Sequence, residues 1–363
     1  MYTFTSESVS EGHPDKVADF IADSILDAYL TDDRHSRVAC EVLCKNDQVV
    51  LAGEITSNAN VDVDRVVRSA VHEIGYNDPS QPFCSETLKI TKLLTTQAPE
   101  IGTGVDTGGA GDQGIMFGYA ANETPELMPL PILLAHRVTY ALAQARKEGV
   151  VEWLRPDCKS QVSVLYDDNS HPQQVATVVV STQHSPDVDQ KTIRDFVTNE
   201  VLPKALGDWN RDGIQLHVNP TGSFVEGGPG TDAGVTGRKI IVDTYGGAAR
   251  HGGGAFSGKD PTKVDRSAAY FCRFVARKVV EEGLAKRAEI QVAYAIGVAE
   301  PVSMKVDSFG TGSEAAAEEF LGNYDFRPQA IIEQLGLAAP IYRKTTNYGH
   351  FGRTGLPWES STE

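Results

Sequence analysis

The sequence predicts an α+β protein of three similar units, each a mostly antiparallel or mixed sheet with helices on one face. Two observations support this fold class. Helix and strand patterns recur in the same order three times, and the leading helices are expected to start near positions 14, 131 and 261. The strand-like segments also come in pairs joined by short turns, which favours antiparallel pairing over one doubly wound parallel sheet.

In the first unit, a helix is expected over residues 14–30, because Ile21, Ile25 and Leu26 lie on one helical face. Strand-like segments follow the helix, and a second helix and a further strand complete the unit. We expect the two strands at 38–43 and 49–55, the second helix near 61–74 and the last strand near 88–94.

The second and third units repeat this order. In the second, a helix near 131–148 precedes strands at 160–166 and 175–181, a helix near 187–206 and a short strand at 214–218. In the third, a helix at 261–282 precedes strands at 290–294 and 302–306 and helices near 314–321 and 328–335. Asp260 suits the N-cap of the leading helix of the third unit, and Pro261 suits its first position.

Composition narrows the class of protein and its partners. The 363 residues carry 33 Lys and Arg against 49 Asp and Glu, a net charge of −16, and 40% of them are hydrophobic. This length predicts two or three globular domains. The acidic excess opposes binding to nucleic acid or to an anionic membrane, although one local basic pocket can still hold a small anion.

The cysteines and the apolar stretches predict a cytoplasmic protein. Five cysteines, widely spaced and without a C-x-x-C motif, argue against a disulfide framework or a zinc site. The first residues lack the pattern of a signal peptide, and the longest apolar stretch, around 127–135, is broken by Pro129 and Pro131. We therefore expect a cytoplasmic location and no membrane-spanning segment.

Glycine is concentrated in two regions that we expect to be ligand-binding loops. Of 34 glycines, 12 lie within residues 222–258 and 7 within residues 102–118. Both regions contain patterns that resemble nucleotide-binding motifs, but neither fits a standard motif. No strand is expected before the G-x-G-x-x-G pattern at 109–114, and Asp260 follows Lys259 where a P-loop has Ser or Thr.

A locally basic window in this acidic chain predicts a phosphate site. Residues 236–267 contain six basic and three acidic side chains. Lys259 precedes the expected helix start, and Lys263 and Arg266 follow it. Free backbone N–H groups and the helix dipole favour an anion at such a position. The alternative is a charged face that is simply solvated.

A second cluster, His13, Asp15 and Lys16, lies at the start of the first helix. Asp15 suits a magnesium ion, because Mg²⁺ in proteins is commonly held by one or two carboxylates, substrate phosphates and water. His13 is either a catalytic group or a helix cap.

Asp15 is also the first of four aspartates that recur every four residues and so share one helix face. We expect the other three, Asp19, Asp23 and Asp27, to form a solvated surface.

Four segments resemble the signatures of the S-adenosylmethionine synthetase family, also called methionine adenosyltransferases. They are SESVSEGHPDK at 6–16, GDQG at 111–114, GRKIIVDTY at 237–245 and GGGAFSGKD at 252–260, and the resemblance extends over nearly the whole chain. It implies three α+β domains related by pseudo-threefold symmetry. We expect an N-terminal domain at 1–97, a shortened mobile lid and glycine-rich loop at 98–113, a central domain at 114–224 and a C-terminal domain at 225–363.

The resemblance also implies a reaction. Methionine sulfur attacks C5′ of ATP, the whole triphosphate leaves, and it is then hydrolysed to pyrophosphate and phosphate. A cage of Lys and Arg with magnesium would stabilise this leaving group, and the sulfur needs no general base. The family implies two Mg²⁺ per site, one K⁺ per subunit, and sites between the subunits of a homodimer or homotetramer. Neither nucleic acid nor a membrane is expected as a partner.

The residue roles implied by the resemblance are carried over position by position. The catalytic groups would be His13, Lys159, Arg238, Lys259 and Lys263. ATP would contact His13, Asp157, Lys159, Phe224, Asp232, Arg238, Lys239, Ala255 and Lys259. Methionine would contact Glu54, Gln97, Asp232 and Lys263. Magnesium would bind Asp15 and Asp265, and potassium would bind Glu41.

Three features depart from the family pattern. The segment 98–111 looks several residues shorter, so we expect a smaller lid that raises KM or relaxes nucleotide choice. Ser223 stands where the family usually places Arg, which removes one positive charge near ATP. Cys158 lies between Asp157 and Lys159, and we expect it to make the ATP site sensitive to thiol reagents.

Two other functions fit the same features. Another magnesium-dependent ATP user, a kinase or a triphosphate hydrolase, would use the basic loops but leave Glu54 and Gln97 without a methionine to bind. A catalytically silent regulatory subunit that binds ATP would result if the short lid and Ser223 abolish turnover.

Overall fold

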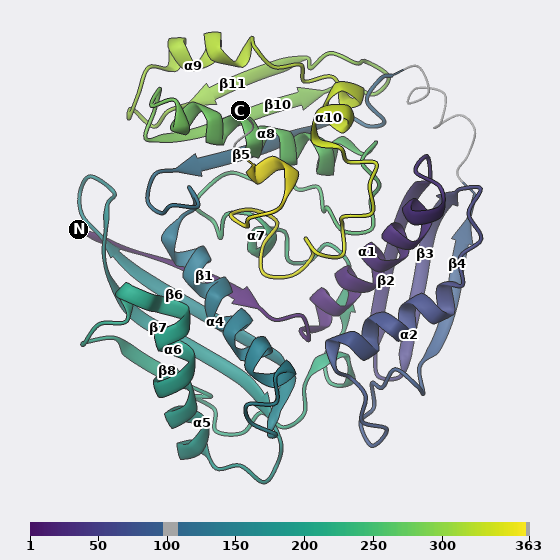
Figure 1. The fold of residues 1–363 in the computed structure, drawn as a ribbon, viewed down its shortest axis with the longest axis vertical. Helices are drawn as coiled ribbons and strands as arrows, with labels where there is room; N and C mark the ends of the chain where they lie inside the picture. The colour runs from purple at the N-terminus through teal and green to yellow at the C-terminus, as the bar shows by residue number, and fades with distance from the viewer. Residues whose placement is uncertain (97–107, 361–363) are drawn as a thin grey trace.

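Three sheets surround a common centre in the computed structural model, which describes residues 1–96 and 108–360 (Figure 1). Each unit has a leading helix that packs against its sheet: α1 (Pro14–Asp32) on β2, α4 (Leu130–Lys147) on β6 and α8 (Val264–Glu281) on β5 and β10. One apolar core lies under α1 and α8, and a second lies under α4. The predicted fold class, three α+β domains with mostly antiparallel or mixed sheets, is confirmed.

The sheet of the first unit has the strand order β4-β3-β2-β9. β2 (Arg37–Lys45) and β3 (Gln48–Thr56) form an antiparallel hairpin, and β4 (Lys89–Thr95) pairs parallel to β3. The short strand β9 (Gly234–Val235) pairs with β2 although it comes from a much later part of the chain. Helix α2 (Val63–Ile74) packs beside α1.

The second sheet has the order β1-β6-β7-β8. Its first strand, β1 (Tyr2–Val9), belongs to the start of the chain, whereas β6 (Leu154–Tyr166), β7 (Pro172–His184) and β8 (Gln215–Val218) follow one another. The single helix expected over 187–206 is interrupted. It consists of α5 (Gln190–Phe196), a π-helical turn and α6 (Leu202–Leu206).

The third sheet has the order β11-β10-β5 and is antiparallel throughout. β5 (Gly114–Ala121) pairs with β10 (Arg287–Tyr294), which also pairs with β11 (Ser303–Asp307). Two short helices complete this unit, α9 (Glu314–Leu321) and α10 (Pro328–Leu335).

Three strands that the sequence analysis did not predict, β1, β5 and β9, each pair with strands from another third of the chain. β1 is rich in Ser, Thr and Glu, and β5 is a short apolar run beside glycines, so neither has a clear strand period. Such pairings depend on tertiary contacts. The domain boundaries given above along the linear chain stay predictions.

The start of α8 differs from the prediction by three residues. The N-cap is Lys263 and the helix begins at Val264, not at Pro261. The Asp260 side chain instead accepts hydrogen bonds from the backbone N–H groups of Thr262 (3.0 Å) and Val38 (2.7 Å). Asp260 therefore closes the turn before the helix and ties it to β2.

The prediction that Asp19, Asp23 and Asp27 form a solvated face of α1 is wrong. Asp19 and Asp23 are fully buried, and Asp27 is 7% exposed. From residue 17 to residue 30 these aspartates are the only charged residues, and α1 packs between its sheet, α2 and later loops. A helix that is apolar on its other faces is expected to be buried.

No helix within residues 1–96 and 108–360 is both long enough and apolar enough to cross a membrane.

Candidate active site

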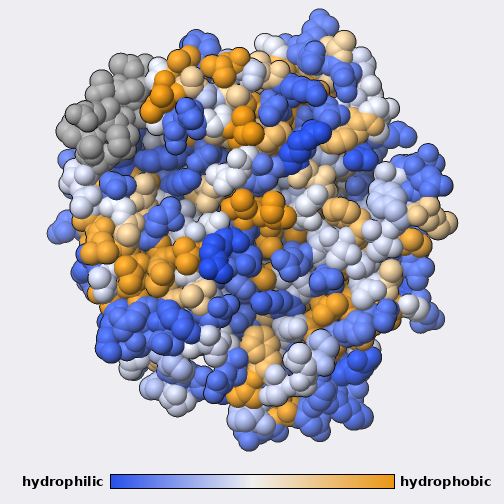
Figure 2. Space-filling view, turned by 180° about the vertical axis from the view of Figure 1, so that it is seen from behind, coloured by the Kyte–Doolittle hydropathy of each residue, from blue (hydrophilic) through white to orange (hydrophobic). Residues whose placement is uncertain are grey.

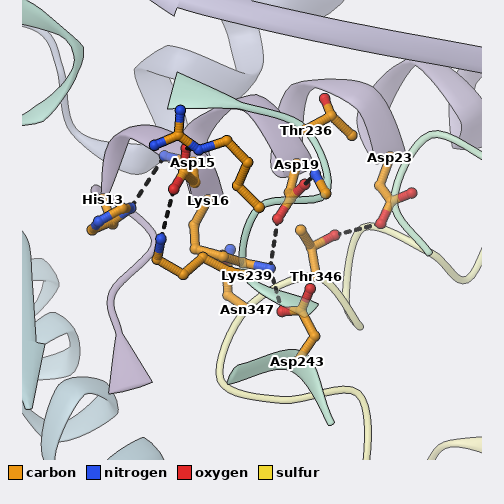
Figure 3. Close-up of polar contacts among 12 residues, drawn as sticks. His13, Asp15, Lys16, Asp19, Asp23, Thr236, Lys239, Asp243, Thr346 and Asn347 are labelled. Atoms are coloured by element: carbon orange, nitrogen blue, oxygen red, sulfur yellow. Dashed lines mark hydrogen bonds and ion pairs between the residues drawn. The ribbon is translucent and has the colours of Figure 1, made fainter. Parts of the chain in front are cut away.

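The start of α1 brings His13 and Asp15 against the residues that follow β9 (Figure 3). The Asp15 backbone N–H donates to Nδ1 of His13 at 3.1 Å, so His13 is the N-cap of the helix. The Asp15 carboxylate accepts from Val235 N–H at 3.0 Å and lies 2.6 Å from Lys239 Nζ and 3.3 Å from Arg238 Nε. Three residues expected around the triphosphate, His13, Arg238 and Lys239, therefore contact one buried aspartate.

His13 is uncharged and Asp15 is charged in this arrangement. Burial, together with Lys239 and Lys159 nearby, lowers the pKa of His13 to about 3, so its imidazole is neutral at physiological pH. Because Nδ1 accepts a hydrogen bond, the ring proton lies on Nε2. Burial acts to raise the pKa of Asp15, but the hydrogen bonds from Lys239 and Val235 outweigh it and hold that pKa below its usual value.

Lys16 forms ion pairs in the protein interior and is not a surface residue. Its fully buried Nζ lies 2.6 Å from Asp243 Oδ1 and 2.9 Å from Asp19 Oδ2 (Figure 3). Burial opposes the charge of Lys16, but the two carboxylates raise its pKa above the ordinary value. Lys16 thereby fastens α1 to the short helix α7 (Ile240–Asp243), which follows Arg238 and Lys239 directly.

A second charged cluster forms where loop 252–260 meets the start of α8. Lys259 Nζ lies 2.8 Å from Asp265 Oδ2, and Lys263 Nζ donates to Asp260 Oδ2. Gly254 permits this close packing, because a Cβ on it would lie 2.1 Å from Asp265 Oδ1. The two lysines expected at the phosphates and the second expected magnesium ligand therefore lie in one cluster.

Strand β2 connects the second cluster to the first unit. Ala39 forms an antiparallel bridge with Lys259, and the Cys40 N–H donates to the Gly258 carbonyl at 3.0 Å. Glu41, the expected potassium ligand, is exposed on the same strand and on the same face as Ala39.

The two clusters meet through Gly237 and Ala255. Gly237 has a φ of 78°, and a Cβ on it would lie 2.5 Å from the Cβ of Ala255. Ala255, an expected ATP contact, therefore packs against the residue that precedes Arg238 and Lys239. The residue at 237 must be glycine for the two loops to approach this closely.

Asp157 and Lys159 approach from β6. Asp157 is buried: its Oδ2 accepts from Gly228 N–H at 2.9 Å, and its Oδ1 has no hydrogen-bond partner among the residues that the structure describes. Burial raises the pKa of Asp157 to about 6, and the Gly228 N–H opposes this only partly. Lys159 is exposed and pairs in register with Val9, shortly before His13.

Phe224, expected to stack on adenine, is half-buried in the loop after β8. Its N–H donates to Nε2 of His184, and the His184 N–H donates to the Phe224 carbonyl, both at 3.0 Å. Ser223, beside it, is exposed. These bonds fix the backbone of Phe224 against the end of β7.

Two of the expected methionine ligands, Glu54 and Asp232, lie near opposite ends of the β2–β3 hairpin. Glu54 on β3 is exposed and pairs in register with Ala39. Asp232 is exposed near the other end of this hairpin, where Lys45 Nζ donates to the neighbouring Thr231 carbonyl. Six strand residues, roughly 20 Å, separate Ala39 from Lys45. Lys263 lies on the Glu54 side, through the bridge between Ala39 and Lys259.

Gln97 and most of the expected lid, 98–107, lie outside the described residues. At the end of that segment, Ala110 is buried and exchanges hydrogen bonds with a distant loop, donating to Val298 O at 3.0 Å and accepting from Gly297 N–H at 2.8 Å. Asp112 is exposed, and its Oδ1 accepts from the N–H of Gln113.

The structure argues against the expected reactivity of Cys158. The side chain is 2% exposed, and burial raises the pKa of its thiol to about 12. Alternate residues of a strand face opposite sides, so Cys158 turns inward where Lys159 turns out. A buried, protonated thiol does not react readily with alkylating reagents.

Within residues 1–96 and 108–360, no group of three or more His, Cys, Asp and Glu side chains is arranged to hold a metal ion. Asp15 and Asp265 instead each place one carboxylate beside a lysine, in the region that the sequence analysis expects to bind phosphate. One or two carboxylates, completed by substrate phosphates and water, are a donor set that Mg²⁺ favours. These two residues therefore fit a metal that binds together with its substrate.

The residues missed by sequence reasoning are the buried polar groups behind these clusters. Asp19, Asp23 and Asp243 contact Lys16, Arg266 and backbone N–H groups of both loops. A signal for them existed, since α1 has no basic residue between 17 and 30 to balance its aspartates.

Sequence profiles of the S-adenosylmethionine synthetase domains match the chain in order. The N-terminal domain matches residues 1–99, the central domain 107–224 and the C-terminal domain 226–360.

Similar proteins support the same assignment. Proteins named S-adenosylmethionine synthase from Akkermansia muciniphila and Sorangium cellulosum are each 55% identical to this chain, over 100% and 99% of it and 96% and 88% of their own lengths. A protein of that name from Desulfosudis oleivorans is 53% identical, over 99% of this chain and 96% of its own length. With all three domains matched in order and more than half of the residues shared, this chain belongs to the S-adenosylmethionine synthetase family.

Proposed function

We propose that the chain is a methionine adenosyltransferase, which forms S-adenosylmethionine from ATP and L-methionine and then hydrolyses the tripolyphosphate to pyrophosphate and phosphate. The observation that carries the proposal is the match of all three family domains, with relatives 53–55% identical over 99–100% of the chain. The arrangement of the charged clusters supports it.

The chemistry asks the protein to stabilise a departing triphosphate. In this structure, Lys239 and Arg238 contact Asp15, and Lys259 contacts Asp265. Cations that are oriented before the substrate arrives stabilise charge that develops on the leaving group without further reorganisation. Phosphate oxygens would take over the free hydrogen-bonding capacity of these cations as the bond from C5′ to oxygen breaks.

His13 suits a donor role at the leaving oxygen. Its ring is neutral and its proton lies on Nε2, because Nδ1 accepts from the Asp15 N–H. A neutral imidazole N–H can donate a hydrogen bond to the bridging oxygen as negative charge grows there. The thioether sulfur of methionine has a free lone pair, so no side chain needs to remove a proton from it.

Asp15 and Asp265 would hold Mg²⁺, two ions per site, and Glu41 would take part in holding one K⁺ per subunit. When bound, Mg²⁺ neutralises charge on the triphosphate. Asp157, Lys159, Phe224, Asp232, Arg238, Lys239, Ala255 and Lys259 are the proposed ATP contacts, and Glu54, Gln97, Asp232 and Lys263 the proposed methionine contacts.

A homodimer or homotetramer with sites between subunits is part of the proposal. The distance between Glu54 and Asp232 within one chain supports it, since a second copy is needed to bring both to one methionine. Figure 2 shows apolar side chains gathered on the face opposite to that of Figure 1. Exposed apolar residues of several strands, Leu43, Leu93, Ile115 and Met304, favour such an association. A cytoplasmic location remains a prediction from the cysteine pattern.

One assay distinguishes the candidate functions. The purified chain is incubated with ATP, L-methionine, Mg²⁺ and K⁺, and the products are identified by mass spectrometry. We expect S-adenosylmethionine with pyrophosphate and phosphate, and no pyrophosphate when methionine is left out. ADP or phosphate alone would support a kinase or a hydrolase, and binding of ATP without any product would support a regulatory subunit.

A further inference from the structure

We propose that Asp19 and Asp23 are positioning residues, which hold the two phosphate-binding loops at a fixed spacing along helix α1. The inference rests on the proposed function, because it takes Arg238, Lys239 and Lys259 as the cations that meet the triphosphate. Neither aspartate belongs to the set of expected ligands.

The four aspartates of α1 share one kind of contact. Each carboxylate accepts at least one backbone N–H from the part of the chain after residue 234, and successive aspartates hold successive segments. The donors are Val235 to Asp15 (3.0 Å), Gly237 to Asp19 (2.8 Å), Gly258 to Asp23 (2.9 Å), and Tyr342 and Arg343 to Asp27 (3.0 and 2.9 Å).

Asp19 holds the first loop. Its Oδ1 accepts from the N–H of Gly237, whose next two residues are Arg238 and Lys239. Its Oδ2 lies 2.9 Å from Lys16 Nζ, which also binds Asp243 on the far side of the same loop (Figure 3). The loop is therefore held before and after its two cationic side chains.

Asp23 holds the second loop in the same way. Its Oδ1 accepts from the N–H of Gly258, the residue before Lys259. Both of its oxygens also accept from the guanidinium of Arg266, at 2.7 and 2.9 Å, and Arg266 follows Asp265 in α8. A bidentate arginine contact fixes orientation as well as distance. Lys259 and Asp265 are thus both adjacent to residues that Asp23 holds.

The helix sets the spacing between the two loops. Residues four apart on an α-helix lie about 6 Å from each other along its axis. Asp19 and Asp23 therefore keep the Gly237 and Gly258 amides one helical turn apart, whatever contacts Arg238, Lys239 and Lys259 make. A rigid support of this kind is what a preorganised electrostatic site requires.

Asp19→Asn and Asp27→Asn are a matched pair of variants for the test. Both side chains are buried, and in both cases each carboxylate oxygen faces a donor. Asparagine keeps one acceptor oxygen and replaces the other by an NH₂ group, so each variant must lose one contact. The variants differ in the segment held, which is residues 237–239 for Asp19 and residues 342–343 for Asp27. Asp19 also pairs with Lys16, which keeps Asp243 as its partner in the Asp19→Asn variant.

We measure binding of inorganic tripolyphosphate by calorimetry, KM for ATP and for methionine, and the thermal unfolding midpoint. Asp19→Asn should weaken tripolyphosphate binding and raise KM for ATP by about tenfold or more, and change KM for methionine by less than about threefold. Both variants should lower the unfolding midpoint, because each loses a buried hydrogen bond. Asp27→Asn should nevertheless change tripolyphosphate binding by less than about twofold. Equal losses of binding in the two variants would overturn the proposal.

A second variant covers the case that Asp19→Asn does not fold. Gly237→Ala keeps all four aspartates but forces the same turn to move, because φ is positive and Ala255 is in the way. It should weaken tripolyphosphate binding like Asp19→Asn, and unchanged binding would overturn the proposal. Tripolyphosphate binding does not require turnover, so a wild-type chain that binds it but forms no S-adenosylmethionine would contradict the proposed function and not the positioning role.

Discussion

Lys16 Nζ lies 2.6 Å from Asp243 Oδ1, and both side chains are buried. The pair joins the first turn of α1 to the segment that follows Arg238 and Lys239. A buried ion pair contributes little net stability when it is intact, because desolvation offsets the attraction. Removing one member is costly, because the other charge stays buried without its partner.

We predict that Lys16→Met lowers the free energy of unfolding by about 3–5 kcal/mol. Urea unfolding followed by circular dichroism measures the change. Lys191→Met is the control, since its side chain is 84% exposed and pairs with the exposed Asp195, and it should change stability by less than about 1 kcal/mol. If the two variants are equally stable, leaving Asp243 buried without Lys16 does not have the cost predicted here.

Lys259 is predicted to act mainly on the rate. Lys259→Met removes one cation that is oriented by Asp265, and we expect kcat for S-adenosylmethionine formation to fall by about 10²–10³. The unfolding midpoint should change little, because Lys259 is partly exposed. A rate close to that of the wild type would show that other residues neutralise the leaving group.

The raised pKa of Asp157 predicts a pH dependence of stability. Its pKa is about 6 in the folded chain and about 4 when unfolded, so the folded state binds the proton more tightly. The resulting stabilisation is complete below about pH 4 and is lost as the pH rises through about 6, a change of about 3 kcal/mol. Asp157→Asn does not titrate.

The unfolding free energy of Asp157→Asn, measured relative to the wild type in urea, should therefore rise between pH 4 and pH 7. Contributions from other titrating groups cancel in this difference. A difference that is independent of pH would mean that the carboxyl group of Asp157 is not desolvated as described.

The thiols are predicted to be inert in the native protein. All five cysteines are buried, and burial raises the pKa of Cys158 to about 12. Treatment with iodoacetamide at neutral pH should leave the native chain unmodified, whereas five carbamidomethyl groups should appear after unfolding in guanidinium. Modification of Cys158 in the native protein, with protection by ATP, would restore the reactivity expected from its position beside Lys159.

Ser223→Arg tests the missing positive charge. Position 223 is exposed beside Phe224, so a longer side chain can be accommodated there. One added charge near a triphosphate contributes about 1 kcal/mol at high dielectric, which corresponds to a KM for ATP about fivefold lower. Ser223→Gln adds length without charge and serves as the control. Equal KM values in the two variants would assign any effect to length.

Much of the fold follows from local sequence. The periodic apolar residues of α1, α4 and α8 and the strand pairs joined by short turns are visible without tertiary information, and the structure has them near the expected bounds. β1, β5 and β9 were missed because their partners are far away in sequence, and a strand with weak alternation is defined only by the strand it pairs with.

In the candidate site, too, the features set by local sequence were predicted and those set by distant segments were not. Glycine and lysine density marked loop 252–260, and the spacing in 13–16 marked the start of α1. The four-residue spacing alone did not reveal the burial of Asp19, Asp23 and Asp27, because it describes a face of the helix and not what covers it. The segments that cover it, 237, 258 and 342–343, come more than 200 residues later.

The pairing of β5 with β10 also has a consequence during synthesis. β5 is an apolar strand, and its only strand neighbour in the described sheet, β10, begins at Arg287. The ribosome must add about 170 further residues before that neighbour exists, which takes on the order of 10–30 s at ordinary elongation rates. Throughout this interval β5 is an apolar strand of the nascent chain without its neighbour β10. An unpaired apolar strand is prone to aggregation, so we expect chaperones to bind β5 while the chain is synthesised.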